Sequence, residues 1–391
     1  MKLADKNACT GCGACAYVCP KECITFITDK TYGIAYPVID DKTCISCGKC
    51  RNACPALSPI NRNEPLHAYA AWSLDEEERR TSASGGIAAE IYKFAINKGW
   101  SIVGAAFGKN LEVSLELSDN PDSIKKFKNS KYVFSSAAHI YQEINTKLKS
   151  GKKVAVIALP CQIAAIRKIF KRDIDNLLLV DLVCHGTTPY LFLFQHIKWV
   201  EQKYGEKVMS ILFRDPMFLT ETFTLTFSNA SNHRFYTYNT KKYGDTYQIS
   251  YHGMISYREN CYHCPFAESK RVSDITLSDY KGLGALTPPY RIRNSRKVSS
   301  ILINTEKGNL FVDALIEEGK IVAQKRPVEE PIRGDSQLRN PSMKSIYRKL
   351  FEVGIKVFSG NFERTMRPIV YLIFLERKLK KMAHFIKRAF F

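Results

Sequence analysis

Two copies of one cysteine pattern, C-x2-C-x2-C-x3-C-P, open this chain. The first copy contains Cys9, Cys12, Cys15 and Cys19, and the second contains Cys44, Cys47, Cys50 and Cys54. Soft thiolates favour iron–sulfur clusters, zinc or Cu(I). A structural zinc site usually takes two C-x-x-C pairs and has no use for a third closely spaced thiolate, whereas three thiolates on one tight loop suit three irons of a cubane. The spacing therefore favours iron–sulfur clusters.

The order of the cysteines also predicts which of them share a cluster. In bacterial ferredoxins with this spacing, the fourth cysteine of each run binds the other cluster. We therefore assign one 4Fe-4S cluster to Cys9, Cys12, Cys15 and Cys54, and the other to Cys44, Cys47, Cys50 and Cys19. Cys23 is left over; we interpret it as a small packed residue, with a ligand role as the second choice. Residues 1–58 are thus predicted to form a ferredoxin domain of the α+β type, with short strands at 24–27 and 34–39.

Composition limits the remaining function classes. The chain has 391 residues, and its 13 cysteines are odd in number and spaced like ligands, which argues against a secreted disulfide scaffold. The first residues, MKLADKNACTG, lack the apolar stretch of a signal peptide, so we expect a cytoplasmic protein. The formal net charge of +20 comes without any nucleic-acid-binding motif, so we expect no nucleic-acid partner.

A mixed α/β body is expected after a Pro- and Asn-rich linker at 59–66. In its first part, residues 67–150, the turn Ser82-Ala83-Ser84-Gly85-Gly86 precedes an amphipathic helical run at 87–97. Glycines and hydroxyls at a helix start can hold a phosphate, although Ser84 as a simple helix cap is the alternative. Strands are expected at 101–107 and 111–117.

The second part of the body, residues 151–340, contains a strand–helix–strand unit and therefore a parallel sheet. Strands are predicted at 152–159 and 176–183, and β structure at 223–227 and 234–240. Cys161 and Cys184 follow the first two strands, at the sheet edge where open α/β folds bind ligands. The pair Cys261 and Cys264 completes a set of four thiols. At this point a cluster, a zinc site and a redox disulfide all stay open.

Six short motifs in the body occur in a recognisable order. They are SASGG (82–86), SKYVFS (130–135), LPCQIAAI (159–166), DLVCHG (181–186), CYHCPFA (261–267) and SDITLSDYKG (273–282). With them the chain resembles the beta subunit of coenzyme F-420 hydrogenase/dehydrogenase, an iron–sulfur flavoprotein family. The resemblance implies FAD held at Ser82, Ser84, Gly85 and Gly86, and a flavin or coenzyme pocket that includes Lys131 and Tyr132. It also implies a third 4Fe-4S cluster on Cys161, Cys184, Cys261 and Cys264.

The function implied is an oxidoreductase that passes electrons between 4Fe-4S clusters and a flavin. Flavins convert between two-electron hydride chemistry and one-electron cluster chemistry. The expected partners are a redox protein or ferredoxin, and coenzyme F-420 or another organic hydride acceptor. Two alternatives stay open: a ferredoxin-dependent reductase in cell-surface polysaccharide biosynthesis, and a non-catalytic electron-transfer subunit of a larger complex. No catalytic residue is singled out.

The tail at 341–391 has its own pattern. It holds 12 Lys and Arg against 3 Asp and Glu, and an apolar run at 369–375 is followed by Leu379, Met382, Phe385 and Ile386 at helical spacing. Seven consecutive apolar residues do not span a bilayer, which needs about 20. A basic amphipathic helix can instead lie on an anionic membrane surface, which would make the protein peripheral at the inner face of the membrane. The alternative is a helix that docks on the protein's own body or on a partner.

Overall fold

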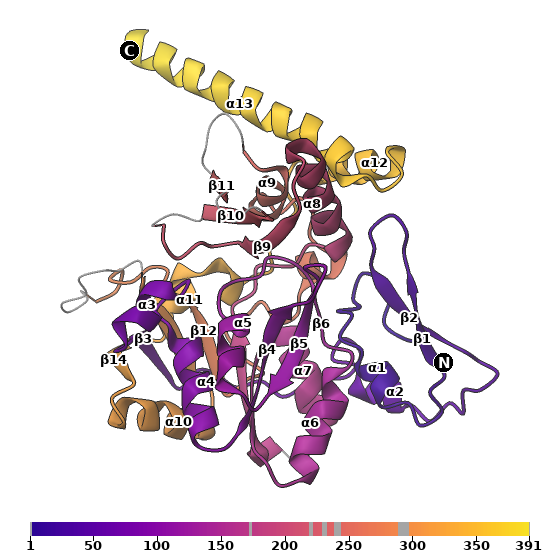
Figure 1. Ribbon diagram of the computed structural model, residues 1–391, viewed down its shortest axis with the longest axis vertical. Coiled ribbons are helices and arrows are strands. Elements are labelled where there is room, and N and C mark those ends of the chain that lie inside the picture. Colours follow the sequence, from indigo (N-terminus) through magenta and orange to yellow (C-terminus); the bar gives the residue numbers. More distant parts are fainter. Residues whose placement is uncertain are drawn as a thin grey trace.

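The computed structural model describes residues 2–171, 174–218, 222–228, 233–237, 244–287 and 297–390, with the side chains of 233–237 and 384–390 excluded. Within these ranges the chain forms a small N-terminal module, a large mixed sheet with helices on both faces, and a smaller sheet covered by helices that include the C-terminal one (Figure 1). The fold is therefore mixed α/β, as the sequence predicts.

The N-terminal module contains the two cysteine runs and one hairpin. Its elements are α1 (Ala14–Tyr17), β1 (Ile24–Thr28), β2 (Ala35–Ile39) and α2 (Lys49–Ala53). The two strands pair antiparallel, with Ile24 opposite Ile39. The module lies beside α6 (Ile140–Lys149) and α7 (Pro160–Ile169) of the body (Figure 1).

Nine strands form the large sheet, in the order β14-β3-β13-β12-β8-β7-β4-β5-β6. Their bounds are β3 (His67–Ser73), β4 (Ser101–Phe107), β5 (Val113–Ser118), β6 (Ser135–Ser136), β7 (Val154–Ala158), β8 (Leu177–Leu182), β12 (Ile275–Asp279), β13 (Ser299–Ile303) and β14 (Ile321–Arg326). The neighbours β4, β7, β8 and β12 run parallel, which confirms the predicted β7–α7–β8 unit. Both predicted parts of the body, 67–150 and 151–340, contribute strands to this one sheet.

Helices cover both faces of the large sheet because its central strands are apolar on both sides. In β7, Ala155 and Ile157 face one core, and Val154 and Val156 face the other, as the two-residue repeat of a strand requires. The first core is covered by α4 (Ile87–Asn97), α5 (Ile124–Phe127) and α10 (Glu306–Glu317), and the second by α6 and α7. The short helices α3 (Glu76–Thr81) and α11 (Glu329–Gly334) lie at the β3 side of the sheet (Figure 1).

A third core joins the smaller sheet to the C-terminal helices. Its strands are β9 (Val208–Leu212), β10 (Thr222–Phe227) and β11 (His233–Thr237), and its helices are α8 (Tyr190–Tyr204), α9 (Thr246–His252), α12 (Arg348–Val357) and α13 (Phe362–Phe390). The strand predicted at 234–240 is seen to residue 237, and the rest lies outside the described residues. Buried His196 of α8 contacts Asp245 at 2.8 Å and Glu363 at 2.7 Å, and so connects α13 to the body.

The tail divides into two parts with different surroundings. Met366, Ile369, Val370 and Ile373 of α13 are buried in the third core, so this half docks on the protein's own body. The distal half extends beyond the body toward the C-terminus (Figure 1). Among the described residues, no helix has the length and apolar character needed to cross a membrane.

Candidate iron–sulfur centres

The first cysteine group lies at the junction between the N-terminal module and the body. Cys9, Cys12 and Cys15 are less than a tenth exposed. Burial, and then the neighbouring thiols Cys12, Cys9 and Cys54, raise the pKa of Cys15 to about 12. The fold thus brings Cys54 from the second run beside the first three cysteines, in the crossed arrangement that the spacing predicts.

The second cysteine group lines a separate pocket near the surface. Cys19, Cys44, Cys47 and Cys50 line it, and Cys47 is exposed to solvent. Cys23 is buried in the same pocket, with its Sγ 3.4 Å from the Sγ of Cys19. Cys23 is therefore packed, as expected, and it is also a fifth thiol beside this group.

The body brings its four remaining cysteines together in one pocket. Cys161 is the second residue of α7, just after β7, and Cys184 follows β8, so adjacent parallel strands bring both thiols to one sheet edge. The short 3-10 helix at Glu259–His263 supplies Cys261 and is followed by Cys264. Burial, and then Cys264, Cys184 and Cys261, raise the pKa of Cys161 well above its usual value. A bound cation would keep these thiols ionised, because thiolates are the species that bind metals.

The grouping of these thiols can be compared with the geometry that a zinc ion needs. Among the described residues, no three His, Cys, Asp or Glu side chains converge closely enough to hold one metal ion. A tetrahedral zinc ion needs all four sulfurs at about 2.3 Å from a single centre. In a cubane each thiolate binds a different iron, so the four sulfurs stand further apart. Four thiols that line one pocket are a donor set that fits a 4Fe-4S cluster, with zinc as the alternative.

The first group and the body group face each other across one pocket. Cys12 lines it together with Cys161, Cys184, Cys261 and Cys264. Tyr141 of α6 fixes this contact, because its buried hydroxyl donates a 2.7 Å hydrogen bond to the carbonyl of Cys12. A cluster on the first group would thus be the neighbour of a cluster on the body group, whereas the second group lies at the outer end.

A row of tyrosines leads from the body cysteines toward the loop predicted to contact the flavin. Tyr257 and Tyr251 are buried, with ring centroids 5.2 Å apart. Tyr251 stacks on Tyr132 at 4.4 Å and 10°. Burial raises the pKa of Tyr257 well above its usual value, and Cys184 and Cys261 add to the effect. Sequence reasoning missed Tyr251 and Tyr257, because isolated tyrosines give no pattern.

The amine of Lys131, the neighbour of Tyr132, is held by backbone carbonyls. Its Nζ donates to the carbonyl of Lys128 at 3.0 Å and stands 5.5 Å from the ring centre of Phe107. Burial lowers the pKa of Lys131 to about 8. A lysine in this state responds readily to a nearby anionic group, which would raise its pKa again.

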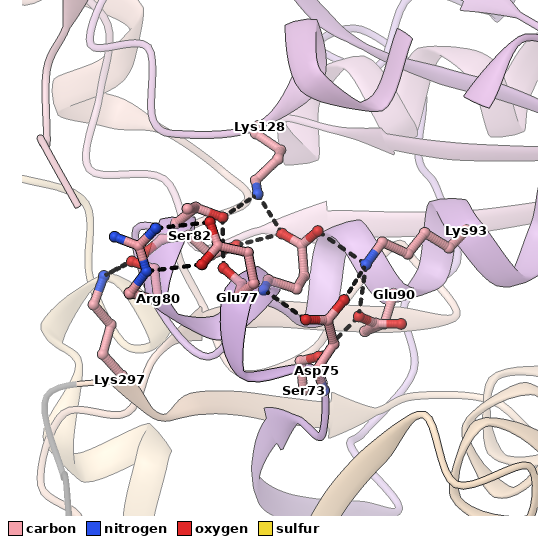
Figure 2. A network of polar contacts seen from close by, with 11 residues as sticks. Ser73, Asp75, Glu77, Arg80, Ser82, Glu90, Lys93, Lys128 and Lys297 are labelled. Carbon is pink, nitrogen blue, oxygen red and sulfur yellow. Dashed lines mark hydrogen bonds and ion pairs between the residues drawn. The ribbon is translucent and has the colours of Figure 1, made fainter. Parts of the chain in front are cut away.

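The Ser82–Gly86 turn lies inside a dense polar network (Figure 2). Ser82 donates to the carboxylate of Glu78 at 2.9 Å, and Ser84 donates to the carbonyl of Val298 at 3.1 Å. The N–H of Gly85 donates to Ser299, and a Cβ on Gly85 would stand 2.5 Å from the carbonyl oxygen of Ala71. Gly85 is therefore required for close packing of the turn on β3 and β13, whatever else it does.

Cations gather beside this turn. Lys128 pairs with Glu78 and donates to Thr81 at 2.8 Å, which places the 128–132 loop next to the turn. Lys297 donates to the carbonyls of Arg80 and Ser82 (Figure 2). Burial, and then nearby Arg214, lower the pKa of Lys297. The start of α4 has no side-chain cap and lies beside these lysines, where the buried carboxylate of Glu78 already pairs with Lys128, so a phosphate held at this corner would compete with Glu78. Sequence reasoning missed Lys297, since it lies more than 200 residues from the turn in the chain.

Segments of the chain match known protein families. Residues 151–328 match the family described as the C terminus of the coenzyme F-420 hydrogenase/dehydrogenase beta subunit. Residues 8–57 match a 4Fe-4S dicluster domain, and residues 36–99 match a second description of such a domain.

The chain is also similar to individual proteins. The F subunit of F(420)H(2) dehydrogenase from Methanosarcina mazei is 22% identical over 341 residues, which cover 83% of this chain and 87% of that protein. The beta subunit of coenzyme F-420 hydrogenase from Methanococcus voltae is 22% identical over 262 residues, which cover 64% of this chain and 81% of that protein. A solved chain of the F-420-reducing NiFe hydrogenase complex from Methanosarcina barkeri is 17% identical, with a TM-score of 0.45 over 80% of this chain and 94% of that chain.

Proposed function

Since residues 151–328 match the C-terminal family of coenzyme F-420 hydrogenase/dehydrogenase beta subunits and residues 8–57 match a 4Fe-4S dicluster domain, we propose that this iron–sulfur chain conducts electrons between its clusters and a flavin. The flavin would exchange hydride with coenzyme F-420 or with another organic acceptor. When bound, flavin and clusters supply the conversion between two-electron and one-electron chemistry. The residues of this chain would bind and orient these groups.

The observation that carries the proposal is the pocket that Cys12 shares with Cys161, Cys184, Cys261 and Cys264. It supports a third cluster placed directly beside the first ferredoxin cluster. On the far side of the pocket, Tyr257 and Tyr251 lead to Tyr132 and to the cationic corner at Lys128 and Lys297. An electron path with the flavin at its inner end is the arrangement that these contacts favour.

The outer end of this path favours a protein partner. Cys47 is exposed, and the neighbouring Ile45 is 57% exposed, so the second cluster would lie close to the surface. A redox centre close to the surface suits a transient contact with another redox protein. We therefore place the docking of a ferredoxin or of another protein of the same complex at Ile45 and Cys47.

The C-terminal helices favour a membrane surface as a further contact. On α12 and the turn before it, Ile346, Leu350, Val353 and Val357 recur at helical spacing, and each is at least half exposed. On the distal half of α13, exposed apolar residues alternate with exposed cations; they are Leu375, Leu379 and Met382, with Arg377, Lys378, Lys380 and Lys381. An anionic lipid surface would use both features, whereas a docked protein helix would need only the apolar ones.

Anaerobic reaction with reduced coenzyme F-420 tests the proposed function. Each hydride delivers two electrons, so the enzyme hypothesis predicts two one-electron cluster reductions, detected by electron paramagnetic resonance, for each coenzyme oxidised. In the Cys261→Ala variant the coenzyme should still reduce the flavin, while the ferredoxin clusters should stay oxidised. Clusters that accept electrons from dithionite, with no reaction of the coenzyme, would favour either another organic acceptor or the non-catalytic electron-transfer role. Adding the physiological partner distinguishes these two.

A further inference from the structure

Arg258 lies buried between the first cysteine group and the body cysteines. Only 3% of the residue is exposed. Its guanidinium donates from Nη1 to the carbonyl of Thr10 at 3.1 Å and from Nη2 to the carbonyl of Cys9 at 3.3 Å, and it stacks 4.2 Å from the ring centre of Phe134. It also lines the pocket that Cys12 shares with the four body cysteines. Arg258 thus contacts the backbone of one predicted cluster site and borders the other.

The charge of Arg258 has no carboxylate partner among the residues that the structure describes, and its buried Nε has no hydrogen-bond acceptor there. Arg271, another buried arginine near the body cysteines, differs in this respect. Its guanidinium forms a 2.9 Å ion pair with buried Asp181. An isolated buried cation is costly unless an anionic group compensates it. The surroundings of Arg258 therefore suit an additional anionic group.

The fold also makes room for this guanidinium. A Cβ on Gly11 would stand 2.9 Å from both Nη atoms of Arg258, and the φ of 70° at Gly11 also favours glycine, so this residue suits the close approach of the first cysteine loop. The backbone of Arg258 is fixed as well, because its N–H donates to the carbonyl of Thr187 at 2.9 Å and its carbonyl accepts from Cys261 at 3.0 Å. Arg258 therefore joins the two cysteine groups at a fixed position.

We propose that Arg258 is a positioning residue for electron transfer: a shared counter-cation that fixes the first ferredoxin cluster against the body cluster and favours the reduced state of both. An all-cysteine 4Fe-4S site carries about −2 when oxidised, and one-electron reduction adds a further negative charge. A fixed positive charge nearby stabilises the more negative state, so it raises the reduction potential. This inference rests on the third cluster in the proposed function.

Redox titration of Arg258→Gln, followed by electron paramagnetic resonance, tests the proposal. We expect iron content to be retained and the one-electron equilibria of two of the three clusters to shift toward oxidation by at least about tenfold, which corresponds to about 59 mV. The outer cluster should be unchanged. Arg348→Gln is the matched control. Like Arg258, Arg348 is buried (5% exposed) and donates to backbone carbonyls, those of Tyr257 and Ile255. Unlike Arg258, it pairs with a carboxylate, that of Glu352. Unchanged potentials in Arg258→Gln, or an equal shift in Arg348→Gln, would overturn the proposal.

A second variant covers the case in which Arg258→Gln fails to bind both clusters. Arg258→Lys keeps the positive charge, so the proposal requires this variant to bind iron like the unmodified chain. If both variants failed to bind the two clusters, the shape of the arginine side chain would matter rather than its charge, and the proposal would be wrong. Iron analysis of the unmodified chain separates this proposal from the proposed function. With about 8 irons in place of about 12, the third cluster would be absent, and Arg258→Gln should then shift one ferredoxin cluster alone.

Discussion

Removing the cations of the distal half of α13 tests the proposed membrane contact quantitatively. The variant replaces Arg377, Lys378, Lys380 and Lys381 by glutamine. A lysine or arginine near an anionic leaflet contributes about 1 kcal/mol. Lys380 already pairs with Glu376, so we discount it and expect a loss of about 3 kcal/mol, which is roughly a hundredfold in partitioning.

The assay is co-sedimentation of the full chain with anionic vesicles at low and at physiological ionic strength. A control variant changes four exposed lysines elsewhere to glutamine, and so removes the same charge from the whole protein; they are Lys42, Lys125, Lys126 and Lys149. We expect the control to bind like the unmodified chain, and both to bind less as salt is raised. Equal loss in the two variants would show that only net charge matters. No binding by the unmodified chain would refute the membrane contact.

Three further predictions concern single side chains. Burial lowers the pKa of His196, but Asp245 and Glu363 outweigh burial and raise it to about 10. The stabilisation of α13 by His196 should therefore be complete below about pH 6.5 and lost as pH rises through about 10. Amide hydrogen exchange of α13, corrected for the intrinsic rate, measures this stabilisation, and local opening that does not depend on pH would contradict the prediction. Tyr141→Phe removes the hydrogen bond to Cys12 and should cost about 1 kcal/mol, seen as faster iron loss to a chelator, while equal rates would show that the bond does not hold the module. Lys297→Gln should lower FAD content and leave iron unchanged; full flavin occupancy would place the phosphate elsewhere.

Much of the local structure could be predicted from the sequence, because short-range patterns determine it. The helix predicted at 87–97 and the strand at 101–107 have the observed bounds of α4 and β4. Apolar runs between turn residues specify such elements without tertiary information. The strand–helix–strand unit also places Cys161 and Cys184 at one sheet edge, as expected from parallel strands.

Contacts between distant segments could not be predicted from one sequence. The linker expected at 59–66 is held against the body, since Asn63 exchanges backbone hydrogen bonds of 2.8 Å with Arg271. Arg258 and Lys297 have no motif around them, and only the folded chain brings them to Cys9 and Ser82. The glycine-rich turn shows the opposite case: its pattern is clear, yet the packing of Gly85 on Ala71 is visible only in the structure.

The packing of Gly85 also decides how the flavin site can be tested. Gly85→Val would disturb β3 directly, because the new side chain would meet the carbonyl of Ala71, and a loss of flavin in that variant would have two explanations. Lys297 lies at the edge of the same turn and packs less tightly, so its substitution separates flavin binding from folding.

We propose a third 4Fe-4S cluster that connects the ferredoxin module to the body, and the iron content of Cys264→Ala decides this claim. Cys264 lines the shared pocket and lies outside the N-terminal module. Anaerobically purified unmodified chain should contain about 12 irons, and Cys264→Ala about 8, with the resonance signals of the two ferredoxin clusters intact. About 8 irons in both proteins, together with zinc that is lost in the variant, would contradict the claim.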